Sequence, residues 1–350
     1  MADRIDLSRS RLLVTGGAGF IGSNFVHDFL ARFPESHVVV LDALTYAGRR
    51  ENLDGIPERS LTFVHGDIRD PAAVTRATDG CELVLNFAAE SHVDRSIESP
   101  GEFIQTDVHG VFVLCEEARR RGVKRFVQIS TDEVYGEVLE GRASEDWPLR
   151  PRSPYSASKA GGDLLALAYH TTYGLPVVVT RSTNNYGPRQ YPEKLIPLFV
   201  TNAIDDLPLP IYGTGENRRD WLHVSDHCAA LVALLQQPGI DGEVFNIGSG
   251  VESDVLAITG AILDHLGRPG TLIRHVEDRP GHDRRYAVDS TRLQRLTGWK
   301  PTIPFARGLL ETVDWYRANE GWWRSARQGD FQPYYERTYG NRGIFKEVRE

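Results

Sequence analysis

Cysteine is scarce in this chain, and its three copies stand far apart. Cys81, Cys115 and Cys228 are the only cysteines among 350 residues. They form neither the closely spaced pairs of a zinc site nor the framework of a disulfide-rich domain. We expect free thiols in a reducing compartment, the cytoplasm. We also expect no metal site, because His92 and His282 have no second ligand at a metal-binding spacing.

Long apolar runs and an excess of basic charge are also lacking. No stretch is long enough to span a bilayer, and the first ten residues, MADRIDLSRS, are too polar for a signal peptide. The net charge of −8 argues against a nucleic-acid-binding protein. We therefore expect no membrane and no nucleic-acid partner. An anionic ligand would need basic residues gathered locally.

Short runs rich in Val, Leu and Ile alternate with segments of helical spacing. The runs are apolar at consecutive positions, as in parallel strands that helices cover on both faces. This alternation predicts an α/β fold with a doubly wound parallel sheet. The predicted strands are 11–16, 37–42, 61–67, 82–89, 124–131, 175–182 and 242–248.

The composition changes after about residue 185. The segments that follow are rich in Pro, Gly and aromatic residues, which predicts loops and short strands over a site. We expect a first domain over 1–185, to which about 223–250 returns. A smaller, loop-rich substrate-binding region would cover 186–222 and 251–350.

A glycine-rich turn follows the first predicted strand. Gly16 allows a tight turn, Gly19 lets the backbone approach a pyrophosphate, and Gly22 lets the next helix pack on the strand. Asp42 ends the second strand, where a carboxylate can bind a ribose 2′-hydroxyl and would repel a 2′-phosphate. The pattern predicts a Rossmann dinucleotide site that prefers NAD to NADP. Asp67 ends the third strand, and either meets the adenine amino group or starts a turn.

Tyr155 and Lys159 stand four residues apart at a predicted helix start, so they share one face. An ammonium beside a phenol lowers the pKa of the phenol, which can then accept a proton from a sugar hydroxyl. The alternative is a half-buried aromatic residue and a solvated lysine. Thr131, at the end of the preceding strand, is a candidate third member.

Two acids stand side by side in STDEVYG, residues 130–136. One interpretation is a helix capping box between Ser130 and Glu133, with Asp132 as a first-turn acid. The other is an acid–base pair, since neighbouring carboxyls under mutual repulsion differ in proton affinity. The second interpretation requires the chain to leave the strand by residue 132.

Several motifs resemble known families. TGGAGFIG, FAAESHVDRS and YSASK are similar to the extended short-chain dehydrogenase/reductases. STDEVYG, NNYGP, PEKLIPLF, RDWLHVSDHC and DRPGHDRRYA resemble, in order, the nucleotide-sugar 4,6-dehydratases, over Arg11 to about Tyr316. The resemblance implies a lyase that uses NAD, binds a nucleotide sugar and forms a homodimer through helices around 103–121 and 156–173. The resemblance does not decide whether the nucleotide of the substrate carries thymidine or uridine.

The resemblance also implies catalytic roles. Tyr155, with Thr131 and Lys159 beside it, would take the proton of the C4 hydroxyl during oxidation at C4. Glu133 would remove the C5 proton, and Asp132 would protonate the departing C6 hydroxyl. Decarboxylases and GDP-mannose dehydratases carry Ser in place of Asp132, and epimerases have no acid pair. A non-catalytic NAD-binding module would typically lack Tyr155 or Lys159.

Binding contacts follow from the same resemblance. The implied NAD contacts are Gly16, Gly19, Phe20, Ile21, Gly22, Asp42, Thr45, Asp67, Ile68, Phe87, Ala88, Ala89, Ser91, Thr106, Tyr155, Lys159 and Asn185. The implied nucleotide-sugar contacts are Ser91, Thr131, Asn184, Lys194, Leu195, Pro210, Tyr212, Arg219, Arg279, His282 and Tyr339. The chain departs from the family at Asp254, where an Asn is usual, and we expect Asp254 to cap a helix instead.

Overall fold

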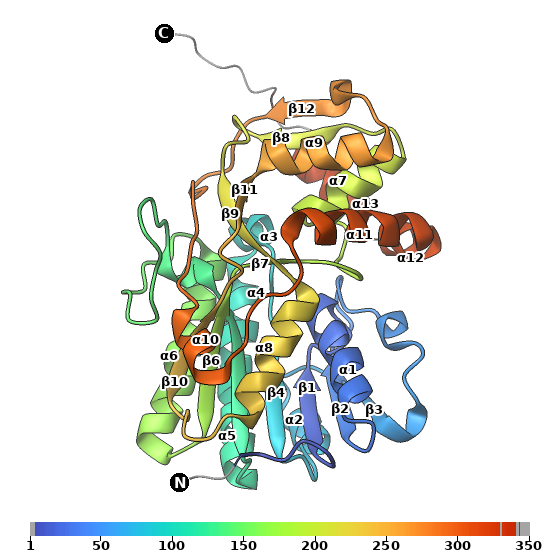
Figure 1. The fold of residues 1–350 in the computed structure, drawn as a ribbon. Helices are drawn as coiled ribbons and strands as arrows, with labels where there is room; N and C mark the ends of the chain where they lie inside the picture. Colours follow the sequence, from blue (N-terminus) through green and yellow to red (C-terminus); the bar gives the residue numbers. More distant parts are fainter. Residues whose placement is uncertain (1–3, 330, 341–342, 344–350) are drawn as a thin grey trace.

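The structure, a computed structural model, describes residues 4–329, 331–340 and 343. Within these residues the main sheet has seven parallel strands, in the order β10-β6-β5-β4-β1-β2-β3 (Figure 1). All seven predicted strands are confirmed, and so is the doubly wound fold. Their bounds are β1 (Arg11–Thr15), β2 (His37–Asp42), β3 (Leu61–His65), β4 (Leu83–Asn86), β5 (Arg125–Thr131), β6 (Val177–Ser182) and β10 (Glu243–Ile247).

Alternate residues of each strand enter two different cores, which is why the strands are apolar at consecutive positions. Leu12 and Val14 of β1 pack in the core beneath α1 and α8, while Leu13 packs in the core beneath α2, α5 and α6. The covering helices are α1 (Phe20–Arg32), α2 (Pro71–Ala77), α5 (Val111–Arg121), α6 (Pro154–Tyr173), α8 (Val224–Gln236) and α10 (Thr291–Thr297).

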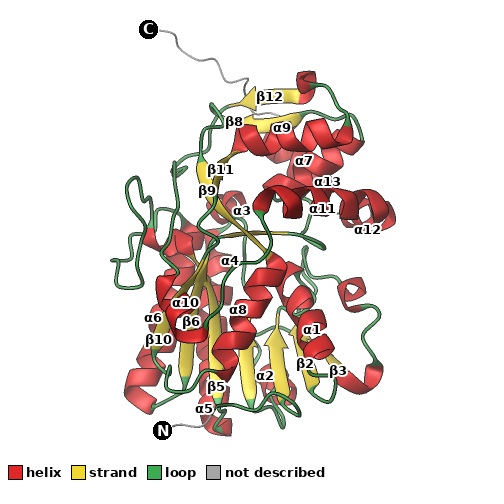
Figure 2. Cartoon of the chain, viewed as in Figure 1, coloured by secondary structure: helices red, strands yellow, loops and turns green. Residues whose placement is uncertain are grey.

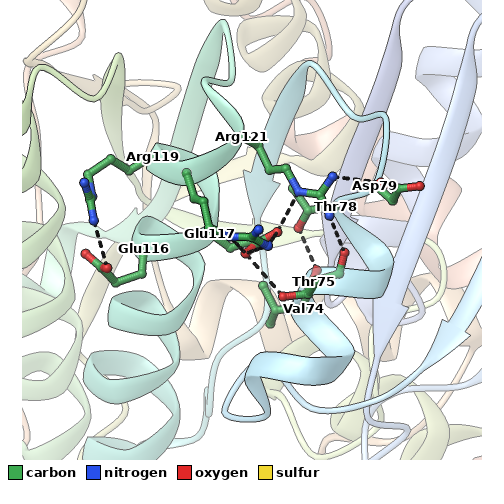
Figure 3. A network of polar contacts seen from close by, with 9 residues as sticks. Val74, Thr75, Thr78, Asp79, Glu116, Glu117, Arg119 and Arg121 are labelled. Atoms are coloured by element: carbon green, nitrogen blue, oxygen red, sulfur yellow. Dashed lines mark hydrogen bonds and ion pairs between the residues drawn. The ribbon is translucent and has the colours of Figure 1, made fainter.

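A polar network joins α2 to α5 on the outside of the second core (Figure 3). Glu117 of α5 accepts hydrogen bonds from Arg121 Nε (2.8 Å) and from Thr75 Oγ1 of α2 (3.2 Å). Arg121 Nη1 also pairs with Asp79 at 2.8 Å. The helix ends that carry these residues lead into β4 and β5, so the network lies at the amino end of the sheet. It therefore ties the two helices together without reaching the opposite edge.

The second region lies beyond the carboxyl ends of the strands of the large sheet, and the arrows of these strands point toward it (Figure 2). It has its own core, built by α7, α9, α11 and the aromatic residues of the C-terminal helices. The sequence predicted only loops and short strands between residues 186 and 222, and α7 corrects that prediction. The small strands are β7 (Asn184–Tyr186), β8 (Leu209–Tyr212), β9 (Arg218–His223), β11 (Glu252–Asp254) and β12 (Ile273–Val276). The helices are α7 (Leu195–Ile204), α9 (Val255–Leu266), α11 (Phe305–Ala318), α12 (Glu320–Ala326) and α13 (Phe331–Tyr335), followed by a π-helical turn, Glu336–Gly340.

Asp254 caps α9, as predicted. Its Oδ1 accepts a hydrogen bond from the backbone N–H of Ala257 at 2.7 Å. Among the helices of the described residues, none is both long and apolar enough to cross a membrane.

Candidate active site

A cavity opens where β1, β2, β4 and β5 end, at the point where the strand order reverses. Such reversals are where open α/β sheets bind ligands. The cavity wall contains every predicted NAD contact and all five predicted catalytic residues. The predicted substrate contacts divide: Ser91, Thr131, Asn184 and Lys194 line the same cavity. The other seven lie outside its wall, and five of them belong either to an aromatic group at Tyr212 or to a basic group near Glu133, as described below.

The glycine-rich turn has little room for side chains. Gly16 has φ +64°, and a Cβ there would lie 2.6 Å from the backbone nitrogen of Ala88. A Cβ on Gly22 would lie 2.4 Å from the carbonyl oxygen of Gly16. In the described residues no side chain caps the start of α1, so its first N–H groups remain available to an anion at the cavity.

Asp42 is held at the cavity by two backbone N–H groups. Its Oδ2 accepts from Ala18 (2.9 Å) and its Oδ1 from Leu44 (2.8 Å), and each oxygen keeps lone-pair capacity for a further donor. Asp67 is different, because its carboxylate binds Arg69 through Nε (2.9 Å), Nη2 (2.7 Å) and the backbone N–H (2.8 Å). Asp42 therefore offers a fixed acceptor, while Asp67 is largely committed to Arg69.

Tyr155 and Lys159 lie on one face at the start of α6, which begins at Pro154 behind a capping box of Ser153 and Ser156. Lys159 is buried, and its Nζ donates to the carbonyl of Ile129 at 2.7 Å. The expected lowering of the phenol pKa is wrong for the chain alone. Burial, followed by the charges of Glu133 and Asp107, raises the pKa of Tyr155 well above its ordinary value. The Lys159 ammonium is hydrogen-bonded to the Ile129 carbonyl. A lowered pKa of the Tyr155 phenol therefore requires positive charge from a ligand.

The two acids leave the strand at the required residue. β5 ends at Thr131, and Asp132–Tyr135 forms a short 3₁₀ helix. Thr131 Oγ1 accepts from the backbone N–H of Glu133 at 3.2 Å, so the predicted capping box of Ser130 and Glu133 is wrong: Thr131 is the cap. Ser130 cannot serve because it is still inside the strand, paired with Arg181 of β6.

Asp132 and Glu133 lie in different electrostatic surroundings. Asp132 is 3% exposed, and its Oδ2 has no hydrogen-bond partner within the described part of the chain. Burial, then the negative charges of Glu133 and Asp220, raise the pKa of Asp132 well above its ordinary value. Burial also raises the pKa of Glu133, but Arg279, Arg219 and Lys194 oppose that rise. The surroundings therefore favour a proton on Asp132 more than on Glu133.

A buried polar chain anchors this turn from behind. Tyr135, its last residue, donates to Asn246 Oδ1 at 2.8 Å and accepts from Arg181 Nη1 at 3.0 Å. Arg181 Nε in turn pairs with Asp163 at 3.1 Å, where both side chains are almost fully buried. Since Asp163 stands one helical turn after Lys159 on α6, the chain fixes the acid pair relative to the Tyr155–Lys159 pair.

The predicted basic residues gather beside the acids. Arg219 is buried and donates to the carbonyl of Asp283 at 2.8 Å, and its guanidinium lies 4.4 Å from the ring centroid of Tyr286. Arg279 lies 3.8 Å from Asp94, and Lys194 Nζ donates to the carbonyl of Ser91. These three cations surround Glu133 electrostatically and supply the local positive charge that an anionic ligand needs.

Aromatic residues meet beyond the basic group. Tyr212 stacks on Tyr339 with ring centroids 5.9 Å apart and meets His282 edge-on at 6.0 Å. Burial, followed by the positive charges of Arg279 and Arg219, lowers the pKa of His282 to about 4, so this ring is neutral near pH 7. Leu195 opens α7, and Pro210 lies in β8 next to this group. The described residues contain no cluster of three or more potential metal ligands.

Sequence reasoning missed two acids in the cavity wall, Glu90 and Glu193. Burial and the charge of Asp107 raise the pKa of Glu90 to about 7. Glu193 is buried and pairs with Arg95 at 3.0 Å. Both stand inside motifs that carried the family resemblance, FAAESHVDRS and PEKLIPLF, which was the available signal.

Comparison with known proteins agrees with this geometry. The family profile described as GDP-mannose 4,6 dehydratase matches residues 13–312. The chain belongs to this family, within the extended short-chain dehydrogenase/reductases. The dTDP-glucose 4,6-dehydratase of Streptomyces niveus is 52% identical over 325 residues, which cover 91% of this chain and 96% of that protein. The dTDP-glucose 4,6-dehydratase of Mycobacterium tuberculosis is 45% identical over 331 residues, 93% of this chain and 99% of that one.

Solved structures show the same fold. The crystal structure of DesIV, a dTDP-glucose 4,6-dehydratase from Streptomyces venezuelae with NAD and TYD bound, matches with a TM-score of 0.88 at 51% identity. The match covers 90% of this chain and 99% of that chain. A UDP-glucose 4-epimerase from Thermus thermophilus in complex with NAD matches with a TM-score of 0.82 at 35% identity, over 88% and 99% of the two chains.

The high proton affinity of Asp132 predicts a particular pH dependence of stability. The folded pKa lies above the unfolded value of about 3.9, so between these values the folded protein holds a proton that the unfolded chain has released. The free energy of unfolding therefore falls as pH rises through this window. In Asp132→Asn this fall should be shallower. The free energy of unfolding of the variant should therefore rise relative to that of the parent protein as pH rises.

Denaturant unfolding at a series of pH values from about 5 to 8 measures this difference. Glu133→Gln is the matched control, and it should change the slope less because three cations oppose the rise of its pKa. Parallel pH curves for the parent protein and Asp132→Asn would contradict a protonated Asp132.

Proposed function

We propose that this protein is an NAD-dependent lyase that converts dTDP-glucose to dTDP-4-keto-6-deoxyglucose. The observation that carries the proposal is the pair of adjacent acids, Asp132 and Glu133, in one cavity with Tyr155 and Lys159. Removing water across C5 and C6 needs a base for the C5 proton and an acid for the C6 hydroxyl at the same time. The relatives named dTDP-glucose 4,6-dehydratase support the choice of this reaction and this nucleotide.

The cavity suits NAD. The glycine turn and the uncapped start of α1 fit a pyrophosphate, and Asp42 offers its carboxylate to a ribose diol. When bound, NAD supplies hydride acceptance at C4 and hydride return to C6. DesIV and the Bacillus anthracis dTDP-glucose 4,6-dehydratase were solved with NAD, which supports the same cofactor here.

The residues of the chain divide the proton transfers among them. With NAD bound, the positive charge of the cofactor would lower the pKa of the Tyr155 phenol, and Tyr155, beside Thr131 and Lys159, would then accept the proton of the C4 hydroxyl. The resulting 4-keto group acidifies the C5 proton, which Glu133 removes. Asp132 delivers its proton to the C6 hydroxyl as water leaves. The burial that raises the pKa of Asp132 keeps that proton available at neutral pH.

The substrate end would be held by the second region. Lys194, Arg219 and Arg279 offer cations to the diphosphate, and Tyr212 and Tyr339 offer ring faces to the base. We assign NAD binding to 1–185 with about 223–250, and nucleotide-sugar binding to 186–222 with 251–350 apart from α10, which packs on the large sheet. Ser91 and Asn184, in the cavity wall, would contact the sugar.

Epimerisation is the second candidate function, because a UDP-glucose 4-epimerase shares the fold at 35% identity. An epimerase only oxidises and reduces C4, so it has no use for a protonated buried acid next to a charged one. A non-catalytic NAD-binding module would need neither Tyr155 nor Lys159. The three cysteines are free and buried, which fits a protein located in the cytoplasm.

The first test separates the two acids. In Asp132→Asn the amide cannot deliver a proton, so elimination should slow by roughly 10²- to 10⁴-fold. Oxidation at C4 and exchange of the C5 proton with solvent should continue through Tyr155 and Glu133. In Glu133→Gln the C5 exchange should stop. NMR of each variant with dTDP-glucose in deuterated water follows exchange and product separately.

The parent protein is the control: it should form the 4-keto-6-deoxy product with no net release of NADH. Elimination at the parental rate in Asp132→Asn would refute the assigned acid. A stoichiometric need for fresh NAD would refute the lyase reaction itself, because the hydride would then not return to C6.

The second test concerns Asp42 and the choice of cofactor. A 2′-phosphate would meet the Asp42 carboxylate, so NADP should bind much more weakly than NAD. Asp42→Ala should narrow this difference in affinity, mainly because the variant should bind NAD more weakly. Titration of the cofactor-free protein with each dinucleotide gives the two dissociation constants. Equal affinity of the parent protein for NAD and NADP would remove the basis for this assignment.

The third test concerns a homodimer. Apolar side chains are exposed along α5 and α6, with Phe112 42%, Leu164 58% and Tyr173 56% exposed. We propose that these helices of two copies pack together around a two-fold axis. Leu164→Asp should yield monomers in sedimentation equilibrium, whereas Leu139→Asp, at a loop residue that is 60% exposed, should not. A monomeric parent protein would exclude the interface.

A further inference from the structure

Arg95 lies between two aromatic rings at the edge of the cavity. It belongs to α3 (Val93–Glu98), and its guanidinium carbon is 3.8 Å from the ring centroid of Tyr46 and 4.2 Å from that of Tyr334. Its Nε donates to Glu193 Oε2 at 3.0 Å. Two aromatic rings and one carboxylate therefore contact the guanidinium group.

The three partners of Arg95 come from separate parts of the chain. Tyr46 stands in the segment after β2, next to Thr45 of the cavity wall and close to Asp42. Glu193 precedes Lys194, and both line the cavity. Tyr334 belongs to α13. A single side chain thus contacts Tyr46, whose neighbours Thr45 and Ala47 line the cavity, Glu193 of the cavity wall and Tyr334 of the C-terminal helix.

Further contacts tie the same segments together. Tyr191 meets Tyr46 edge-on at 5.6 Å and Phe331 of α13 at 6.3 Å, and the hydroxyl of Tyr334 lies 3.1 Å from His92 Nδ1. Tyr191, Phe331 and Tyr334 are all buried. The cluster is therefore a packed junction, in which a shift of one segment must displace the others.

The charge at this junction depends on Arg95. The Glu193 side chain is 1% exposed, and the cations that oppose the rise of its pKa are Lys194 and Arg95. Arg95 also offsets the charge of Glu90 in the same wall. A lysine could keep the charge, but its ammonium has no planar faces to stack between two rings.

We propose that Arg95 is a positioning residue that couples cofactor binding to nucleotide-sugar binding. The inference rests on the proposed function. A cofactor seated against 42–48 fixes Tyr46, Tyr46 fixes Arg95, and Arg95 holds Glu193 and the neighbouring Lys194 in the arrangement that receives the sugar nucleotide. Binding linkage is reciprocal, so the nucleotide must strengthen retention of the cofactor by the same factor.

The experiment measures the dissociation constant of thymidine diphosphate by calorimetry, with the protein loaded with NAD and with NAD removed. In the parent protein NAD should tighten nucleotide binding by about 5- to 150-fold. In Arg95→Lys this factor should approach one. The KM for dTDP-glucose should rise more than kcat falls, because the reacting groups stay in place while the sugar-nucleotide wall loosens.

Arg324→Lys is the matched control. Arg324 also lies over a ring, that of Trp323 at 4.3 Å, and pairs with a carboxylate, Asp205 at 2.9 Å, but neither it nor these partners line the cavity. The Arg324→Lys variant should therefore have the same coupling factor as the parent protein. Tyr334→Leu tests the junction independently of charge and should lower the coupling, whereas Tyr334→Phe keeps the ring and should preserve it.

A parental coupling factor in both Arg95→Lys and Tyr334→Leu would overturn the proposal, and so would a parent protein in which NAD does not affect nucleotide affinity. If Arg95→Lys does not fold, as judged by circular dichroism, the two Tyr334 variants decide. Failure of the proposed function is distinguishable, because the parent protein would then not turn over dTDP-glucose at all.

Discussion

Repulsion between two carboxyls in one short buried turn is the constraint around which this site is arranged. Asp132 is buried, and within the described residues one of its oxygens has no hydrogen-bond partner, while Glu133 has three cations around it. The difference in proton affinity follows from placement alone, since the two residues are adjacent in the chain. Burial of Asp132 costs stability, and the buried chain from Tyr135 to Asp163 holds the turn in place despite that cost.

The sheet makes this placement possible. Seven parallel strands bring their carboxyl ends to one edge, and the reversal of strand order between β1 and β4 leaves a gap between the covering helices. Thr131 ends β5 at that gap, and Tyr155 reaches it from the start of α6. Residues from distant parts of the chain therefore meet because their strands and helices end at the same edge.

Much of this could be predicted from the sequence, and the exceptions have identifiable physical causes. Strands buried on both faces leave a clear apolar pattern, which identifies β1, β2, β4, β5, β6 and β10, while the edge strand β3 keeps only a shorter apolar run. The helix α7 is hidden in the sequence because its segment is rich in Pro, Gly and aromatic residues, although a proline such as Pro197 is tolerated in a first turn. The capping-box interpretation places the cap at Ser130 and not at Thr131, because spacing alone does not show where a strand ends.

Two other features depend on the three-dimensional structure. The sign of the pKa shift of Tyr155 depends on burial and on which carbonyl receives the Lys159 ammonium, and neither is visible in a motif. The junction at Arg95 brings Tyr46 and Tyr334 together. These two residues are so far apart along the chain that no sequence motif links them.

The alternation of each strand between two cores also limits how this chain can change its length during evolution. Inserting one residue into β1 would send Leu12, Leu13 and Val14 each to the opposite face, so that two cores would lose their packing at once. The glycine turn that follows has no space for a compensating shift. Insertions and deletions among descendants of this chain should therefore accumulate in the loops at the amino edge of the sheet and within the second region, while the spacing from Arg11 to Gly22 stays constant.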